Sequence, residues 1–314
     1  MSRYIKIMDD TNVRVNSAKA WFLAARPKTL TGAAVPVMIG IACAVALHGV
    51  EVRWVPAVLC MLFALIMQID ANFVNDYFDF MKGTDDEQRL GPKRACSQGW
   101  ITAPAMRSAL LLTTAVACVV GLPLILYGGW EMILVGLACV VFCFLYTISL
   151  SYMGLGDVLV LVFFGLVPVS MTYWLVAPAS PLLSIPLTVI GLSLACGLVI
   201  DTLLVVNNYR DIDNDRRTGK RTLIVKIGAK NGRCLYLWLG IAACIVNFLF
   251  CYLPAVWPWL LPLFYLPFHI ATYREMVRID KGAALNHVLG KTARNMFLYG
   301  LLTAAGQVLS LTMV

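Results

Sequence analysis

Nine apolar segments, each long enough to cross a lipid bilayer, dominate this sequence. A membrane helix needs about 20 predominantly apolar residues. Such segments run, to within a few residues, over 30–48, 54–74, 106–126, 130–150, 157–177, 183–206, 233–252, 256–273 and 294–313. Hydrophobic residues make up 60% of the chain and charged residues only 13%, which excludes a water-soluble fold and intrinsic disorder. We therefore predict an all-α, multi-pass membrane helical bundle of about nine transmembrane helices, with residues 1–314 forming a single domain.

The positions of the basic residues agree with this number of spans. All but one of the 25 Lys and Arg residues lie before the first segment or in the connections between segments 2 and 3, 6 and 7, and 8 and 9. In a nine-span chain these regions share one side, which the positive-inside rule identifies as cytoplasmic. We expect a cytoplasmic N-terminal segment (1–28) and two cytoplasmic motif loops at about 75–105 and 207–232. The lipid bilayer is then the partner, and the net charge of +8 needs no nucleic acid to explain it.

Two of the cytoplasmic connections begin with similar acidic motifs. Asn75–Asp79 reads NDYFD and Asn207–Asp211 reads NNYRD, so the two motifs differ at two of five positions. A glycine and a basic pair follow each motif, and the basic pairs are Lys93–Arg94 and Lys220–Arg221. This pattern indicates a weak internal repeat of two helix ends, each leading into a basic loop.

The spacing within each motif places its polar residues on one helix face, because residues three or four apart are neighbours on a helix. The expected stripes are Asn72, Asn75 or Asp76, and Asp79 in the first motif, and Asn208, Asp211 and Asp215 in the second. Carboxylates gathered beside a bilayer repel one another, and a hard cation with oxygen ligands removes that cost. Mg²⁺ takes one or two carboxylates and completes its shell with water and phosphate oxygens. The motifs therefore predict a magnesium site facing a phosphorylated substrate.

Three further features leave alternatives open. Asp70 and Asp201 lie about two helical turns before the motifs, where each could serve the site or form a helix–helix hydrogen bond. Asp157 opens the fifth segment, where it either orients a substrate or caps the helix. The ten cysteines include no CxxC pair and indicate packing rather than disulfides or a zinc site. A secondary transporter, which also combines repeats with intramembrane acids, is the alternative from another functional class.

The composite of motifs resembles the UbiA superfamily of membrane-embedded aromatic prenyltransferases. Within that superfamily it is most similar to the 1,4-dihydroxy-2-naphthoate polyprenyltransferase branch of menaquinone biosynthesis. The supporting residues, besides the two motifs, are Ala25–Leu30 (ARPKTL), Arg89–Arg94 (RLGPKR), Gly154–Asp157 (GLGD) and the continuation of the second motif to Leu223. One departure concerns the first motif, because strict spacing from Asn75 puts Gly83 where its last acid belongs. That acid is then Asp85 or Asp86.

The resemblance implies a reaction and a set of site residues. A polyprenyl diphosphate would condense with 1,4-dihydroxy-2-naphthoate at a bacterial cytoplasmic (inner) membrane, losing CO₂ and pyrophosphate to give demethylmenaquinone. A 4-hydroxybenzoate or homogentisate acceptor is the alternative within the family. The implied cofactor is Mg²⁺, and the implied catalytic and metal-binding residues are Asp76, Asp79, Asp211 and Asp215, with Asp86 as a further metal ligand. The implied substrate-binding residues are Lys28, Asn72, Asn75, Lys82, Arg94, Tyr146, Asp157, Asn208, Lys220 and Arg221.

Overall fold

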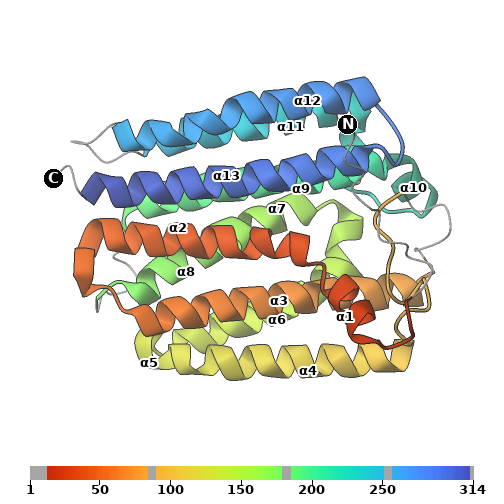
Figure 1. Ribbon diagram of the computed structural model, residues 1–314, viewed down its shortest axis with the longest axis horizontal. Helices are drawn as coiled ribbons and strands as arrows, with labels where there is room; N and C mark the ends of the chain where they lie inside the picture. Colours follow the sequence, from red (N-terminus) through yellow and green to blue (C-terminus); the bar gives the residue numbers. More distant parts are fainter. Residues whose placement is uncertain (1–12, 84–89, 179–184, 251–256, 312–314) are drawn as a thin grey trace, which may run out of the picture.

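The chain forms one bundle of long helices in the computed structural model, which describes residues 13–83, 90–178, 185–250 and 257–311. The helices lie side by side along the longest dimension of the molecule (Figure 1). The long helices are α2 (Leu30–His48), α3 (Trp54–Met81), α4 (Ala103–Gly121), α6 (Glu131–Ile148), α8 (Val167–Val176), α9 (Leu187–Arg210), α11 (Leu223–Leu249), α12 (Leu266–Ile279) and α13 (Leu285–Leu311). The shorter elements are α1 (Ala18–Ala25), η2 (Pro27–Thr29), η3 (Gly49–Glu51), η4 (Leu122–Leu124), α5 (Ile125–Gly128), η5 (Leu150–Met153), α7 (Gly156–Val160), η6 (Leu161–Leu166), α10 (Ile212–Arg217) and η8 (Trp257–Tyr265).

Seven stretches of the described residues are long and apolar enough to cross a membrane. They are Ala18–His48, Trp54–Met81, Ala103–Gly128, Glu131–Ile148, Gly156–Val176, Leu187–Arg210 and Leu223–Leu249. These stretches coincide with the first seven predicted segments and confirm the all-helical membrane bundle. The eighth and ninth segments form η8 with α12, and α13, which run alongside the other helices (Figure 1). Membrane crossing by these last two segments stays a prediction.

The last helix, α13, contains several polar side chains that point into the protein. Asn295, Thr303 and Gln307 are 1%, 1% and 5% exposed. The Asn295 amide donates to the Thr272 hydroxyl at 2.9 Å and to the Phe268 carbonyl at 3.1 Å, both on α12. The helix packs against α2, α9 and η8. Polar groups buried in this way are hidden from lipid, so the composition of α13 reflects its interior position.

The fifth predicted segment is continuous, but it contains a turn of π-helix. Pro168 lacks the amide hydrogen that would return to the Phe164 carbonyl, and such gaps in the hydrogen-bond ladder favour a π-bulge. The wide turn covers Leu161–Leu166, and the Phe164 carbonyl accepts a weak hydrogen bond from the Cys196 thiol of α9 at 3.8 Å. The bulge therefore lies where this segment packs against α9.

Close packing at this bulge depends on Gly165. A Cβ atom there would lie 2.6 Å from the Ser193 carbonyl oxygen and 2.7 Å from the Cα of Gly197. Because both are backbone atoms of α9, we expect Gly165→Ala to lower the free energy of unfolding by about 1–3 kcal/mol. Thermal unfolding in detergent measures the effect. Gly136→Ala is the control, since nothing lies within 4 Å of a Cβ at Gly136, and an equal loss there would contradict the packing explanation.

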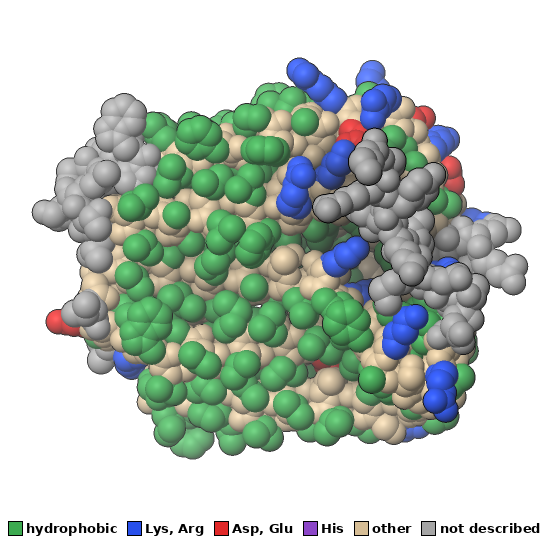
Figure 2. Space-filling view, viewed as in Figure 1, with side chains coloured by type: hydrophobic (Ala, Val, Ile, Leu, Met, Phe, Trp, Pro, Cys, Tyr) green, Lys and Arg blue, Asp and Glu red, His purple; other side chains and the backbone are tan. Residues whose placement is uncertain are grey.

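Both acidic motifs lie at one end of the bundle. The C-terminal end of α3, helices α1 and α10, and the loop before α4 meet there (Figure 1). Most of the Lys and Arg side chains on the face shown in Figure 2 gather at this same end, whereas hydrophobic side chains cover the sides. This arrangement agrees with the charge asymmetry expected from the sequence.

Candidate active site

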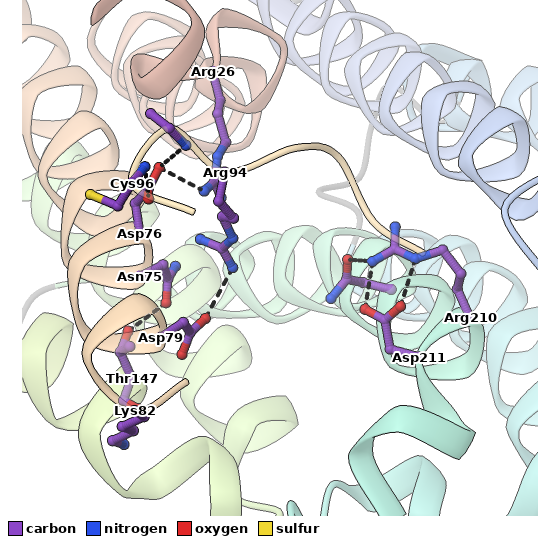
Figure 3. A network of polar contacts seen from close by, with 12 residues as sticks. Arg26, Asn75, Asp76, Asp79, Lys82, Arg94, Cys96, Thr147, Arg210 and Asp211 are labelled. Carbon is purple, nitrogen blue, oxygen red and sulfur yellow. Dashed lines mark hydrogen bonds and ion pairs between the residues drawn. The ribbon is translucent and has the colours of Figure 1, made fainter. Parts of the chain in front are cut away.

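The acids of the first motif attach α3 to the loop formed by residues 90–102, which we call the 90–102 loop. The carboxylate of Asp76 is fully buried and accepts hydrogen bonds from the amides of Ala95 at 2.8 Å and Cys96 at 3.0 Å. Arg26 lies 3.9 Å from the same carboxylate. One turn later, the Asp79 carboxylate pairs with Arg94 of the loop at 3.1 Å (Figure 3). The first motif therefore positions its own basic loop.

The two asparagines of the first motif hold neighbouring helices. The Asn72 amide donates to the Ala25 carbonyl and the Thr29 hydroxyl, each at 2.9 Å, and so holds the turn that leads into α2. The Asn75 carbonyl oxygen accepts a hydrogen bond from the Thr147 hydroxyl on α6. Substrate contact by these two residues stays a prediction, and the structure gives each of them a positioning role.

The second motif contains a buried arginine that joins several groups. The Arg210 side chain is 0% exposed and binds the Asp211 carboxylate through two nitrogens, at 2.8 and 2.6 Å. The same guanidinium donates to the side-chain oxygens of Asn207 at 2.8 Å and Asn286 at 2.9 Å. Asn286 in turn donates to the Leu90 carbonyl at 2.8 Å. The second motif is thus connected to the 90–102 loop through α13.

The 90–102 loop contacts the first motif directly and is linked to the second through Asn286. Leu90 is linked to Arg210 through Asn286, and Arg94, four residues later, pairs with Asp79. Four residues of extended chain span at most about 14 Å. Figure 3 shows the two networks in one close-up, with Asp79 near the end of α3 and Asp211 at the end of α9. The two motifs are therefore linked to the same loop.

Tyr146 lies near the end of α6, and its ring faces Gly156 at the start of α7. The carboxylates of Asp79 and Asp215, one from each motif region, are both close enough to act electrostatically on its phenol. Asp157 and Asp201 act on the same phenol. Four acids from three parts of the sequence therefore act electrostatically on one tyrosine.

A small pocket opens beside Tyr146 and brings together four of the predicted substrate-binding residues. Its lining consists of Tyr146, Ser151, Gly154, Gly156, Asp157, Asn208, Lys220 and Thr222. Lys220 supplies a cation, Asp157 an acid, and Asn208 an amide. In this small pocket, a cation, an acid and an amide are arranged so that they can contact the polar edge of a ligand.

Tyr152 is a site residue that sequence reasoning missed. The Nζ atoms of Lys82 and Lys220 lie 4.3 and 5.7 Å from the centroid of its ring. Its carbonyl accepts a hydrogen bond from the Arg221 amide at 3.0 Å, and Lys82 also donates to the Ile148 carbonyl at 2.7 Å. One lysine from each motif region thus meets the same aromatic ring, an arrangement favoured by cation–π attraction. In the sequence, a tyrosine just after an apolar segment is indistinguishable from an ordinary interfacial aromatic residue.

Two further predicted site residues, Asp215 and Lys28, lie within the described part of the chain. Asp215 is 4% exposed in α10, where its amide donates to the Asp211 carbonyl and its carbonyl accepts from the Lys220 amide, both at 2.8 Å. Lys28 is exposed in η2. Asp85 and Asp86 lie outside the described residues, so the choice between them stays open.

The acidic side chains of the two motif regions are the candidate ligands of a metal ion. No group of three His, Cys, Asp or Glu side chains within the described ranges is arranged to hold a metal ion. The acids of the two motif regions nevertheless supply oxygen ligands of the kind that Mg²⁺ prefers, and metal binding by Asp79, Asp211 and Asp215 stays a prediction. The same holds for Asp76, although the 90–102 loop already contacts both of its oxygens.

Comparison with known proteins identifies the family. Residues 33–302 match the model of the UbiA prenyltransferase family. The chain belongs to that family. It is therefore a membrane-embedded prenyltransferase, the resemblance noted in the sequence is confirmed, and the transporter alternative has no support.

Individual relatives agree with this assignment. The 1,4-dihydroxy-2-naphthoate octaprenyltransferase of Escherichia coli (strain K12) is 33% identical, over 96% of this chain and 98% of that protein. The apo structure of a UbiA homolog from Aeropyrum pernix K1 matches with a TM-score of 0.65 at 14% identity, covering 90% of this chain and 98% of that one. A UbiA homolog from Archaeoglobus fulgidus, bound to DMAPP and Mg²⁺, matches with a TM-score of 0.59 at 13% identity, covering 94% and 100%.

Proposed function

We propose that this UbiA prenyltransferase transfers a polyprenyl group from polyprenyl diphosphate to 1,4-dihydroxy-2-naphthoate, releasing CO₂ and pyrophosphate. The observation that carries the proposal is that one basic loop links the two acidic motifs: its Arg94 pairs with Asp79, and Asn286 joins its Leu90 to Arg210. The acceptor is inferred from the near full-length similarity to the E. coli octaprenyltransferase at 33% identity.

The diphosphate would bind between the two motifs. Lys82, which lies over the ring of Tyr152, is placed to neutralise its negative charge. Asp79, Asp211 and Asp215 would hold Mg²⁺, with Asp86 proposed as a further ligand. When bound, the ion supplies positive charge to the departing pyrophosphate, and such stabilisation of developing charge is among the largest contributions to catalysis. The Mg²⁺ and DMAPP in the A. fulgidus relative support this assignment.

Bond changes in the proposed reaction follow from charge and electron balance. The C–O bond of the prenyl diphosphate breaks and leaves an allylic cation, which an aromatic face such as that of Tyr146 can stabilise by about 0.5–2 kcal/mol. The electron-rich naphthoate ring supplies the electron pair of the new C–C bond, and the pair freed by loss of CO₂ returns to the ring. Because no electrons leave the acceptor, the immediate product is the reduced quinol, and demethylmenaquinone forms when that quinol is oxidised.

The bundle suits a substrate with a charged head and an apolar tail. On the face shown in Figure 2, hydrophobic side chains cover the flank of the bundle, and most of the Lys and Arg side chains gather at one end. The prenyl tail would lie among the helices or in lipid while the diphosphate reaches the charged end. By the positive-inside rule, we propose that this end and the N-terminus face the cytoplasm across a bacterial cytoplasmic membrane.

Product analysis tests the proposed function. Purified protein in lipid vesicles is incubated with Mg²⁺, octaprenyl diphosphate and 1,4-dihydroxy-2-naphthoate. We expect equal amounts of pyrophosphate and CO₂, and a lipid with the mass of the decarboxylated, prenylated naphthoquinol or its quinone. A product formed only with 4-hydroxybenzoate or homogentisate in parallel reactions would overturn the proposed acceptor. Failure to form a prenylated product with any of the three acceptors would contradict the proposal as a whole.

A further inference from the structure

Two buried carboxyl groups at the pocket lack hydrogen-bond partners among the described residues. Asp157 is 7% exposed with neither oxygen bonded, and Asp201 is 3% exposed with Oδ1 unbonded. The two side chains are near enough to interact electrostatically. Burying a polar group without a partner costs free energy, and each such case in a folded protein needs an explanation. A ligand that donates hydrogen bonds would supply one.

Asp70, the counterpart of Asp201 in the sequence repeat, has a different environment. It is 0% exposed, and its two oxygens accept hydrogen bonds from Thr113 and from Thr114, the latter at 3.0 Å, both on α4. Asp70 therefore joins two helices, which is one of the two roles left open by the sequence. Asp201 instead lies near a second acid, Asp157, which lines the pocket.

A capping role does not account for Asp157. It is the second residue of α7, and no side chain forms a capping hydrogen bond at that helix start. Its place is in the pocket lining, together with Tyr146, Asn208 and Lys220. Asp201 precedes Asn208 by seven residues on α9, which is about 10 Å of helix. The acid pair thus extends from the pocket toward the bundle interior, and Lys220 belongs to the loop at the charged end.

We propose that Asp157 and Asp201 recognise a hydroxyl group of the aromatic acceptor, while Lys220 pairs with the acceptor's carboxylate. The proposal rests on the function proposed above. A carboxylate of the substrate would be repelled by the acid pair and attracted by the lysine, whereas a phenolic hydroxyl can donate to the unbonded carboxyl oxygens. Because the pocket is small, only one edge of the ring would enter. The hydroxyl concerned is the one at C4, the farther of the two from the carboxylate.

Binding of two acceptor analogues tests this assignment without relying on turnover. The probes are 1,4-dihydroxy-2-naphthoate and 1-hydroxy-2-naphthoate, which differ only in the C4 hydroxyl, and their dissociation constants are measured on the full chain in detergent with Mg²⁺ and a non-reactive prenyl thiodiphosphate. A hydrogen bond to a charged group corresponds to roughly a ten- to hundredfold preference for the dihydroxy compound. We expect Asp157→Ala and Asp201→Ala to reduce this preference to within about threefold of unity. Neither variant should lower the melting temperature, because each removes an unbonded buried acid.

Two control variants separate recognition from folding. Asp70→Ala should lower the melting temperature, since Thr113 and Thr114 lose their acceptor, and should leave the preference unchanged. Lys220→Met should weaken both probes equally, because both carry the carboxylate. If an alanine variant fails to fold, Asp157→Asn and Asp201→Asn replace it, with a smaller but still reduced preference expected.

The outcomes distinguish this inference from the proposed function. An unchanged preference in the Asp157 and Asp201 variants, or an equal loss in the Asp70 variant, overturns the role of the acid pair alone. If the wild-type chain binds neither probe and forms no prenylated product from 1,4-dihydroxy-2-naphthoate, the proposed function itself fails.

Discussion

Asp211→Asn is expected to lower the rate of prenyl transfer roughly a hundredfold to a thousandfold. The Asp211 carboxylate is held by two hydrogen bonds from Arg210 at the end of α9, so its position is defined before substrate arrives. Removing its charge removes a proposed metal ligand while keeping the size of the side chain. Pyrophosphate release at saturating substrate measures the rate, and a thermal melt checks folding.

Asp213→Asn is the matched control for this substitution. Asp213 lies two residues away, but its side chain is 68% exposed and pairs with Arg216 at 3.5 Å and Lys281 at 3.8 Å on the surface. Exposed ion pairs contribute little to stability, so we expect near-normal activity and stability. A similar loss in both variants would show that the effect is not specific to Asp211, and near-normal activity of Asp211→Asn would remove this residue from the mechanism.

Chelation of divalent cations is expected to abolish pyrophosphate release, and added Mg²⁺ to restore it. Without the ion, the charge that builds on the leaving group is not neutralised. The protein should nevertheless stay folded, because Asp79 and Asp211 pair with Arg94 and Arg210. Activity and melting temperature are measured in EDTA and after Mg²⁺ is returned.

Two results would contradict this account of the metal. Turnover that persists in EDTA would exclude Mg²⁺ as a required cofactor. Global unfolding in EDTA would show that the ion pairs with Arg94 and Arg210 are not enough to keep Asp79 and Asp211 stable without the metal.

By mass action, Mg²⁺ together with a non-reactive prenyl thiodiphosphate should raise the melting temperature more than Mg²⁺ alone.

The membrane bundle and the positions of both motifs could be predicted from sequence because they depend on local patterns. Apolar length predicts spans, and the i, i+3 and i, i+4 spacing places acids such as Asp76 and Asp79 on one face of a helix. The spacing does not predict which residues that helix face contacts. Asp76 binds the amides of Ala95 and Cys96, a contact across about 20 residues that no helical pattern contains.

The parts of the site that were missed depend on contacts between distant segments. Asn286 joins Arg210 to the 90–102 loop from the start of α13, more than 70 residues from the second motif. The ring of Tyr152 lies close to Lys82, which follows the first motif, and to Lys220, which follows the second. Neither residue stands in a motif, so only the packed bundle reveals its place.

The repeated acids Asp70 and Asp201 illustrate the same limit. Asp70 precedes its motif by five residues and Asp201 by six, yet threonines of α4 hydrogen-bond to Asp70 and no described residue does so to Asp201 Oδ1. The difference arises from the neighbouring helix, because α4 presents hydroxyl groups to Asp70 while the Asp157 region presents a second acid to Asp201.

The central claim is that one diphosphate is bound by both motifs, and equilibrium binding of a non-reactive prenyl thiodiphosphate tests it most directly. The measurement compares the wild-type chain, Asp79→Asn and Asp211→Asn in the presence of Mg²⁺. We predict that each substitution weakens binding roughly ten- to a hundredfold, because each removes a charge from a different side of the same site. Wild-type affinity in either variant would show that the two motifs do not share one diphosphate and would contradict the account.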